Sequence, residues 1–299
     1  MSTADAASAR DPAPGAAALD GGRAIDWSRT SADYAAHRPG PPQRLFDLLA
    51  VLGVGVPGQR ILDLGTGTGL VARTFARRGA RVSGIDIAPG QIAEATRSAA
   101  AEGLAAEFVV AAAEACPFGD ASFDAIVASQ CWMYFDVAAT IAEVRRLLRP
   151  GGVLVTTHFS WLPGADAVAR ASEALVLRAN PAWQGAGWSG QVPAEPAWCE
   201  GHARVQAMFW FDADVPFTHE TWRGRMRACR GVGATLPGAG VEAFDAALAR
   251  WLEANVAPAF TVRHRIDAHV FDPWPAVRTD CAAVERKILP PAPTQGHPF

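Results

Sequence analysis

The stretch that decides the fold runs Arg60-Ile-Leu-Asp-Leu-Gly-Thr-Gly-Thr-Gly-Leu-Val-Ala-Arg-Thr-Phe-Ala-Arg-Arg-Gly79. Residues 61–64 form a short apolar run typical of a parallel strand buried on both faces, and apolar residues recur at helical spacing after the last glycine. Gly65, Gly67 and Gly69 stand where a side chain would keep the backbone away from a ligand. The unpaired N–H groups of the following helix point into the same turn. The stretch therefore predicts a strand, a glycine turn and a helix that together hold an oxygen-rich ligand.

The glycine turn fits two kinds of nucleotide ligand. Gly67-Thr-Gly-Leu-Val-Ala72 matches the dinucleotide fingerprint G-x-G-x-x-A, which would indicate an NAD(P)-dependent oxidoreductase. Two acidic residues favour a different ligand: Asp63 lies two positions before the first glycine, and Asp86 follows within the next apolar run, residues 82–87. A carboxylate in the position of Asp86 can accept hydrogen bonds from both hydroxyls of a ribose.

The segment Asp63-Leu-Gly-Thr-Gly-Thr-Gly69, followed by Asp86, resembles the first two motifs of class I S-adenosylmethionine-dependent methyltransferases. The resemblance implies an α/β fold with a Rossmann-like seven-stranded sheet, helices on both faces, and S-adenosyl-L-methionine as the cofactor. In that family the glycine turn approaches the methionine and ribose parts of the cofactor. The resemblance places cofactor contacts at Tyr34, Asp63, Gly65, Thr66, Gly67, Gly69, Asp86, Ile87, Gln91, Ala113, Glu114 and Ser129.

Two further segments extend the resemblance on either side of the glycine turn. Residues 34–39 resemble the Y-x-x-x-R-P signature of a broad group of small-molecule methyltransferases, in which it lies over the cofactor pocket. Alternatively, Tyr34 and Arg38 only pin this segment to the domain. Residues 112–118 resemble the turn D-A-E-x-L-P-F, but the acid that holds the adenine amino group is an alanine here. That contact must then come from Glu114, from main chain or from water, and Glu114 is alternatively a solvated turn residue.

The acceptor side of the resemblance is weaker. Residues 129–136 resemble the Q-x-x-H-W-F-D segment beside which the family's substrate lies, but Met133 replaces its His and Tyr134 its Trp. An acid–base role of that His is therefore absent or has moved elsewhere. His158 lies near the end of a predicted fifth parallel strand, residues 153–159, at the edge where open α/β sheets bind ligands. Its imidazole is a candidate catalytic base, or alternatively a structural or substrate-contacting residue.

A composition rich in Trp, Pro and Gly begins at about residue 164 and predicts an inserted helix and a long loop, up to residue 203, as a cap over the site. Alternating residues predict two antiparallel strands, 205–211 and 261–271, that complete the sheet, with two helices between them. Arg supplies a fork for a carboxylate and Trp a stacking surface. Substrate contacts are predicted at Trp132, Tyr134, Trp222, Arg223 and Arg227. Alternatively, the cap tryptophans form its core and its arginines a solvated helix face.

Composition limits the partners and the compartment. The 299 residues include 27 Lys plus Arg against 30 Asp plus Glu, which gives no reason to expect a nucleic acid or a membrane surface as partner. The five cysteines lack the paired spacing of a zinc site or a disulfide framework, so we expect no metal and reduced thiols in the cytoplasm. The predicted regions are a disordered leader (1–24), a cofactor-binding Rossmann-like core (25–160), a substrate cap with the C-terminal strands (161–289) and a frayed tail (290–299).

These observations predict a methyltransferase that acts on a compact small molecule, aromatic or acidic, with N- or O-methylation favoured. In-line methyl displacement requires alignment and exclusion of water, and needs a base only if the acceptor is protonated. The alternatives are the oxidoreductase above and a catalytically silent domain that binds S-adenosylmethionine and regulates a partner. The sequence leaves the oligomeric state open.

Overall fold

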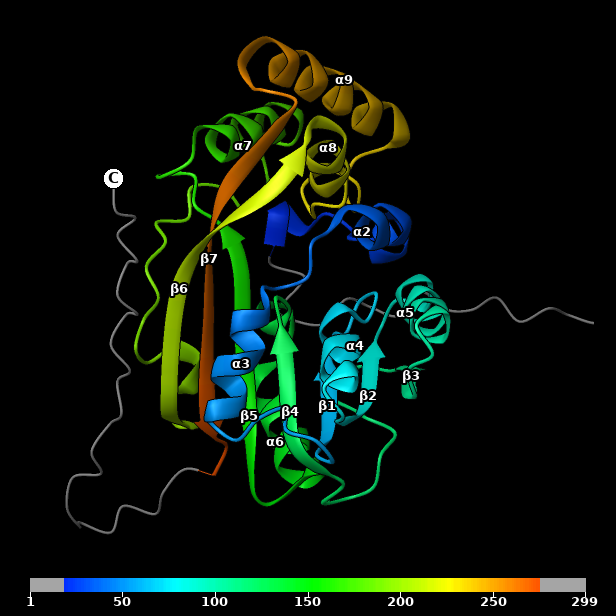
Figure 1. Cartoon of the computed structure of the whole chain (residues 1–299), viewed down its shortest axis with the longest axis vertical. Coiled ribbons are helices and arrows are strands. Elements are labelled where there is room, and N and C mark those ends of the chain that lie inside the picture. Colours follow the sequence, from blue (N-terminus) through cyan, green and yellow to red (C-terminus); the bar gives the residue numbers. More distant parts are fainter. Residues whose placement is uncertain (1–18, 275–299) are drawn as a thin grey trace, which may run out of the picture.

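The computed structural model describes residues 19–274, which form a seven-stranded sheet in the order β3-β2-β1-β4-β5-β7-β6 (Figure 1). The strands are β1 (Arg60–Leu64), β2 (Arg81–Asp86), β3 (Ala106–Val110), β4 (Phe123–Ser129), β5 (Leu148–Trp161), β6 (Arg204–Thr218) and β7 (Ala259–Asp272). The first five strands pair in parallel, and β7 is antiparallel to both of its neighbours. The predicted seven-stranded Rossmann-like sheet is thus confirmed.

Helices cover both faces of the sheet. They are α2 (Ser31–His37), α3 (Gln43–Val51), α4 (Leu70–Arg77), α5 (Pro89–Ala101), α6 (Val137–Leu147), α7 (Ala167–Ala179), α8 (His219–Arg227) and α9 (Gly238–Asn255). Alternation along β1 explains the two layers, because successive side chains of a strand face opposite ways. Ile61 joins the apolar cluster that contains Phe75 of α4, whereas Leu62 joins the cluster that contains Ile141 of α6.

The cap lies over the carboxyl ends of the parallel strands. Figure 1 shows α7, α8 and α9 gathered beyond the ends of β4 and β5, with α2 next to α8. Strands β6 and β7 extend past the rest of the sheet to reach these helices. One apolar cluster runs from Phe75 in α4 through Phe159 and Phe217 to Trp222 and Leu248. Cap and sheet therefore share a continuous core.

Three elements differ from the sequence predictions, and one of them is β6, which continues to Thr218 rather than ending at residue 211. β5 ends at Trp161 rather than at residue 159, because its last residues pair with β7, Trp161 opposite His264. The seven-residue helix α2 was not predicted, since so short a segment shows little periodicity. It is held by packing: a Cβ at Gly224 of α8 would overlap the ring of His37, so the two helices approach closely.

The predicted disordered leader, residues 1–24, is wrong in its last part. Asp20 is fully buried in a 3₁₀ helix, η1 (Leu19–Gly22). Its carboxylate forms an ion pair with Arg230 (Oδ2 to Nε, 2.7 Å) and accepts a hydrogen bond from the Gln184 N–H at 2.9 Å. A buried carboxylate requires such partners, and both come from distant cap residues that the leader's own composition does not reveal. Residues 1–18 and the predicted frayed tail, 290–299, lie outside the described residues.

No helix between residues 19 and 274 combines the length and the apolar character needed to cross a membrane. The four cysteines of this part of the chain are buried and unbridged: Cys116, Cys131, Cys199 and Cys229.

Candidate ligand-binding site

The glycine turn joins β1 to α4 at the carboxyl edge of the sheet. Gly65, Gly67 and Gly69 all have positive φ angles (59°, 56° and 75°), which residues with a Cβ rarely adopt. A Cβ at Gly65 would lie 2.9 Å from the Cys131 side chain, so this glycine is required for packing. A Cβ at Gly67 would meet no atom closer than 3.8 Å. A Cβ at Gly67 would therefore only touch Gln91 and Tyr34 at ordinary van der Waals distance, so packing within the protein does not require a glycine here.

Asp86 at the end of β2 is bound to the same turn. Its Oδ2 accepts from the Gly67 N–H at 3.0 Å, and its Oδ1 accepts from the Ala88 N–H at 2.9 Å. Burial raises the pKa of Asp86, while these two hydrogen bonds act in the opposite direction. A carboxylate has about four lone-pair sites. Asp86 therefore retains acceptor capacity for the hydroxyls of a ligand.

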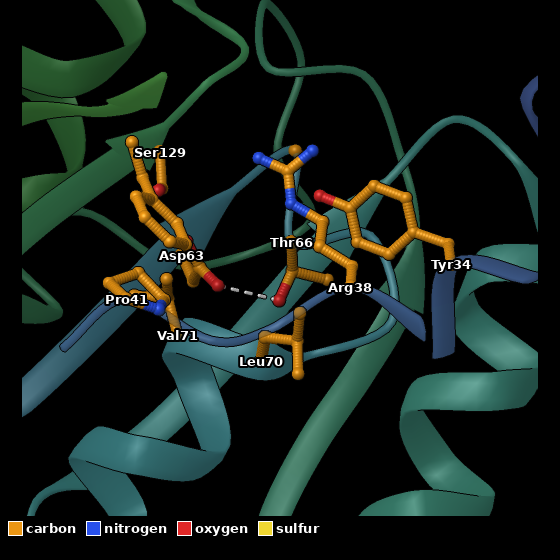
Figure 2. A pocket seen from close by; sticks show the side chains of 10 residues that line it. Tyr34, Arg38, Pro41, Asp63, Thr66, Leu70, Val71 and Ser129 are labelled. Carbon is orange, nitrogen blue, oxygen red and sulfur yellow. Dashed lines mark hydrogen bonds between the residues drawn. The ribbon is translucent and has the colours of Figure 1, made fainter. Parts of the chain in front are cut away.

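Asp63, in β1, lies below the turn with half of its carboxylate unpaired. It is 1% exposed, and the Thr66 hydroxyl donates to its Oδ2 at 2.7 Å, the dashed line of Figure 2. Within residues 19–274 its Oδ1 is buried without a hydrogen-bond partner. Burial raises the pKa of Asp63 to about 7. Such a carboxyl favours a hydrogen-bond donor or a cationic group in any ligand that reaches it.

A pocket that is partly open to solvent lies beside this carboxylate. It is lined by Tyr34, Arg38, Pro41, Asp63, Gly65, Thr66, Leu70, Val71, Ser129 and Phe159. Figure 2 shows the Arg38 and Tyr34 side chains side by side at this pocket, and the Arg38 guanidinium carbon lies 4.7 Å from the Tyr34 ring centroid. Both side chains are thus placed where a ligand could meet them, and their role as cofactor contacts stays a prediction.

The structure brings five of the predicted cofactor residues to the pocket: Tyr34, Asp63, Gly65, Thr66 and Ser129. The site prediction missed five lining residues, Arg38, Pro41, Leu70, Val71 and Phe159. Two of them carried a usable signal. Arg38 belongs to the Y-x-x-x-R-P segment, and strand alternation places Phe159 on the face of Ser129 and Asp63.

Gln91 and Ile87 lie near the glycine turn without lining the pocket. Gln91 is buried; its amide donates to the Trp27 carbonyl at 3.1 Å, and its Oε1 has no hydrogen-bond partner in the described chain. That oxygen is the atom nearest to a Cβ built on Gly67. Ile87 is 59% exposed, which leaves an apolar surface beside Asp86. Both residues remain available to a ligand that occupies the turn.

Ala113 and Glu114 have structural contacts. Ala113 is buried in the apolar cluster of the α6 face. Glu114 accepts a hydrogen bond from the Asp136 N–H at 3.0 Å, at the start of α6. The structure thus gives Glu114 a helix-capping contact that neither sequence interpretation anticipated, and adenine binding by this residue stays a prediction.

His158 is not brought to the pocket. Phe159 lines it, and the preceding residue of a strand faces the other side of the sheet. On that side the His158 Nδ1 lies 3.0 Å from Asp267 Oδ1, on the neighbouring strand β7. His158 therefore does not line this pocket, and its place in the acceptor site stays a prediction. A catalytic role for His158 stays a prediction.

Trp132 and Tyr134, in a 3₁₀ helix η3 (Trp132–Tyr134), are more buried than expected of substrate contacts. Trp132 is 4% exposed and packs against Trp198 with ring centroids 4.6 Å apart, and its Nε1 has no partner among the residues described. The Tyr134 hydroxyl accepts a hydrogen bond from Arg230 at 3.2 Å. Neither side chain lines the pocket. Both lie in the apolar cluster on the α6 face of the sheet or against it.

The predicted cap contacts of α8 are corrected by the structure. Trp222 has no exposed surface, and its indole N–H donates to Ser172 at 2.9 Å. Arg223 pairs with Asp245 of α9. Arg227 pairs with Asp33 at 2.7 Å and with Asp245 at 2.9 Å. The alternative of a tryptophan core therefore holds for Trp222, while the side chains of Arg223 and Arg227 are partly exposed (32% and 24%) and form ion pairs that tie α8 to α2 and α9.

The sheet defines a class of fold. An NAD-binding Rossmann sheet has the strand order 3-2-1-4-5-6 and is mostly parallel, whereas here an antiparallel β7 is inserted between β5 and β6. The chain superposes on the solved structure of a proposed type II methyltransferase from Anaeromyxobacter dehalogenans with a TM-score of 0.51 and 23% identity, covering 78% of this chain and 96% of that one. The architecture is that of class I methyltransferases.

The sequence comparisons agree with this class. Residues 62–156 match the family model of a methyltransferase domain. A demethylmenaquinone methyltransferase of Thermus thermophilus is 44% identical over 104 residues, which is 34% of this chain and 47% of the relative. A ubiquinone biosynthesis O-methyltransferase of Methylocella silvestris is 42% identical over 98 residues, 32% of this chain and 38% of the relative. The chain thus spans less than half the length of these curated relatives. The residues that match the family model, 62–156, include the glycine turn, Asp86 and Ser129.

Proposed function

We propose that this chain transfers a methyl group from S-adenosyl-L-methionine to a small-molecule acceptor. The observation that carries the proposal is the pocket at the carboxyl edge of the sheet, bounded by the glycine turn and by the Tyr34–Arg38 segment. The methyltransferase-domain match over residues 62–156 supports the same activity. The fold argues against the dinucleotide alternative, because the antiparallel β7 differs from the sheet of NAD-binding proteins.

The residues of the pocket fit this cofactor. Asp63 supplies a buried acceptor atom without a partner, suited to a cationic part of the ligand. Asp86 keeps acceptor capacity for ribose hydroxyls, and Gly67 leaves the space into which a side chain would otherwise project. When bound, the cofactor supplies an electrophilic methyl group. The chain binds and orients the reactants and excludes water from them.

The acceptor is proposed to be a compact aromatic or acidic metabolite that approaches from the cap side of the pocket, with N- or O-methylation favoured. Phe159 from β5 and Arg38 from the segment before α3 line the pocket and would contact it. A general base is not required for an acceptor that is already deprotonated or neutral. The chain itself offers Asp63, whose pKa of about 7 lets it hold or release a proton near neutral pH.

Calorimetry with S-adenosylhomocysteine tests the cofactor assignment. Asp86→Ala should weaken binding by about tenfold to a hundredfold, because a charge-assisted hydrogen bond contributes about 1.5–3 kcal/mol. Asp124→Ala is a matched control: this carboxylate lies at the opposite end of β4, where it accepts from the Arg60 N–H at 2.7 Å. An unchanged dissociation constant for Asp86→Ala, or binding of NADH in place of S-adenosylhomocysteine, would contradict the assignment.

A catalytically silent, regulatory domain is the second candidate, because the pocket would equally serve a protein that binds the cofactor without transferring its methyl group. Methyl turnover separates the two. Host extract incubated with the protein and methyl-labelled cofactor should yield a labelled small molecule in mass spectrometry. No labelled product, together with tight S-adenosylhomocysteine binding, would favour the regulatory domain.

A further inference from the structure

Helix α8 carries arginines on two opposite faces. Arg223 and Arg227 are four residues apart and share one face, whereas Arg225 lies about half a turn away from both. The first two are paired with carboxylates of α2 and α9. Arg225 is only 7% exposed, and its side chain has no hydrogen bond or ion pair with any residue between 19 and 274. Its guanidinium carbon lies 4.8 Å from the centroid of the Trp161 ring.

A second unpaired guanidinium lies next to it. Arg38 lines the pocket and stacks on Tyr34, again without an ion pair in the described chain. The close approach of α2 and α8 at His37 and Gly224 brings the neighbours of these residues, Arg38 and Arg225, together. Burial, and after it the positive charge of Arg38, lowers the pKa of Arg225. Both groups nevertheless stay charged at neutral pH, because arginine does not lose its proton in proteins.

In the described part of the chain, no carboxylate is among the ionisable groups that act on Arg225, which are Arg38, Cys229 and Tyr34. Burial raises the pKa of the Cys229 thiol. Burial lowers the pKa of the adjacent His264 to about 4, so that this imidazole is neutral. Aromatic rings lie close by, with Phe159 4.8 Å from the ring of His264. Arg225 is thus a buried positive charge beside aromatic side chains, with Arg38 as its positively charged neighbour at the pocket.

A buried charge without a partner is costly and is retained where a ligand provides the partner. We propose that Arg225 and Arg38 together bind an oxyanion, a carboxylate or a phosphate group, of the small molecule that occupies the pocket. Arginine forks match both groups. This inference rests on the proposed function for the identity of that molecule, and it defines the acceptor as acidic. The cofactor's own carboxylate is the other source of the same chemistry.

The position in the sheet favours the acceptor as the source. Trp161, against which Arg225 lies, pairs with His264 at the β5–β7 ladder. The glycine turn follows β1, and β4 separates β1 from β5. Neighbouring strands are about 4.8 Å apart, so Arg225 lies roughly 10 Å across the sheet from the turn, whereas Arg38 lines the pocket beside the turn. A molecule that enters from the cap side therefore meets Arg225 before it meets Asp86.

The test compares Arg225→Gln with Arg263→Gln in buffer free of phosphate and sulfate. Arg263 is an exposed arginine of β7 that pairs with Asp214, which makes it a matched control. Inorganic phosphate should raise the unfolding temperature of the wild-type and Arg263→Gln proteins, but not that of Arg225→Gln. Without phosphate, Arg225→Gln should unfold about 2–4 °C above the wild type, because an unpaired buried charge is removed.

Calorimetry with S-adenosylhomocysteine and with 5′-methylthioadenosine, which lacks the carboxylate, identifies the source. Unchanged affinities for both in Arg225→Gln assign the oxyanion to the acceptor. A loss of about tenfold or more for S-adenosylhomocysteine alone assigns it to the cofactor. The inference is overturned if phosphate and S-adenosylhomocysteine act on Arg225→Gln as on Arg263→Gln, or if Arg225→Gln lowers the unfolding temperature. If neither nucleoside binds the wild type, the proposed function fails, and the phosphate comparison still decides the anion site.

Discussion

Replacing Asp63 by Asn should make the protein more stable at pH 8 and leave it nearly unchanged at pH 4. Asp63 is 1% exposed, its Oδ1 lacks a partner in the described structure, and burial raises its pKa from 3.8 to about 7. Between these two values the folded protein holds a proton that the unfolded chain has lost. Stability that is fully present below pH 4 is therefore lost as the pH rises to about 7.

The size of the effect follows from the same two values. The difference between 3.8 and about 7, at about 1.4 kcal/mol for each pKa unit, corresponds to about 4 kcal/mol. Asn keeps the shape and an acceptor for the Thr66 hydroxyl, but it carries no charge. The free energy of unfolding of Asp63→Asn should therefore exceed that of the wild type by up to about 4 kcal/mol above pH 7.

Urea unfolding followed by circular dichroism from pH 4 to pH 8 measures this difference. Asp214→Asn serves as control, since its side chain is 55% exposed and pairs only at the surface with Arg263. The control should follow the wild type within about 0.5 kcal/mol. Parallel curves for the wild type and Asp63→Asn over the whole range would refute the reasoning, because they would mean that Asp63 ionises as it does in the unfolded chain.

Three further predictions concern the turn, the cap and the imidazole. Gly67→Ala should fold with a loss of about 1–2 kcal/mol in unfolding free energy, because residue 67 has a positive φ angle. The branched side chain of Gly67→Val should also abolish S-adenosylhomocysteine binding in calorimetry. Normal binding by the valine variant would contradict the expectation that a ligand occupies the space beside Gly67. Trp222→Phe should destabilise the protein by about 1–3 kcal/mol in denaturant unfolding, because it leaves a cavity and an unpaired Ser172 hydroxyl. It should not change ligand affinity. Weaker ligand binding with unchanged stability would mean that Trp222 contacts the ligand after all. His158→Gln should change the rate of methyl transfer by less than about tenfold, because the imidazole lies against Asp267 and does not line the pocket. A drop of about 10²–10⁴-fold in this rate in steady-state assays would instead identify His158 as a general base.

The cofactor side of the site could be predicted from the sequence because its parts are local. Residues 63–69 form the turn by themselves, and Asp86 ends the neighbouring parallel strand, so a short pattern fixes their geometry. The hydrogen bond from Gly67 N–H to Asp86 links two adjacent elements of one βαβ unit. The sheet and the helices that flank it follow from the same local patterns.

The acceptor side could not be predicted because it depends on pairings between distant segments. Arg227 was a candidate for the substrate until the fold brought Asp33, 194 residues away, into contact with it. Sequence spacing shows that residues 223 and 227 share a helix face, but not that this face meets α2 and α9 while Arg225 is left unpaired. His158 shows the corresponding difficulty for strands. The sheet face on which a strand residue lies depends on the register of that strand, which the sequence alone does not give.

The insertion of β7 between β5 and β6 determines how the protein can be assembled on the ribosome. The parallel strands β1 to β4 and their helices can pair as they emerge, since each of these strands has a partner within this same stretch of chain. β6 has no strand to join until residues 259–272 are made, and α8 and α9 lie in the chain between these two strands. During synthesis β5 presents an open edge, a hazard for pairing with other chains. The arginines of α8 therefore reach their places last, after the nucleotide half of the pocket has formed.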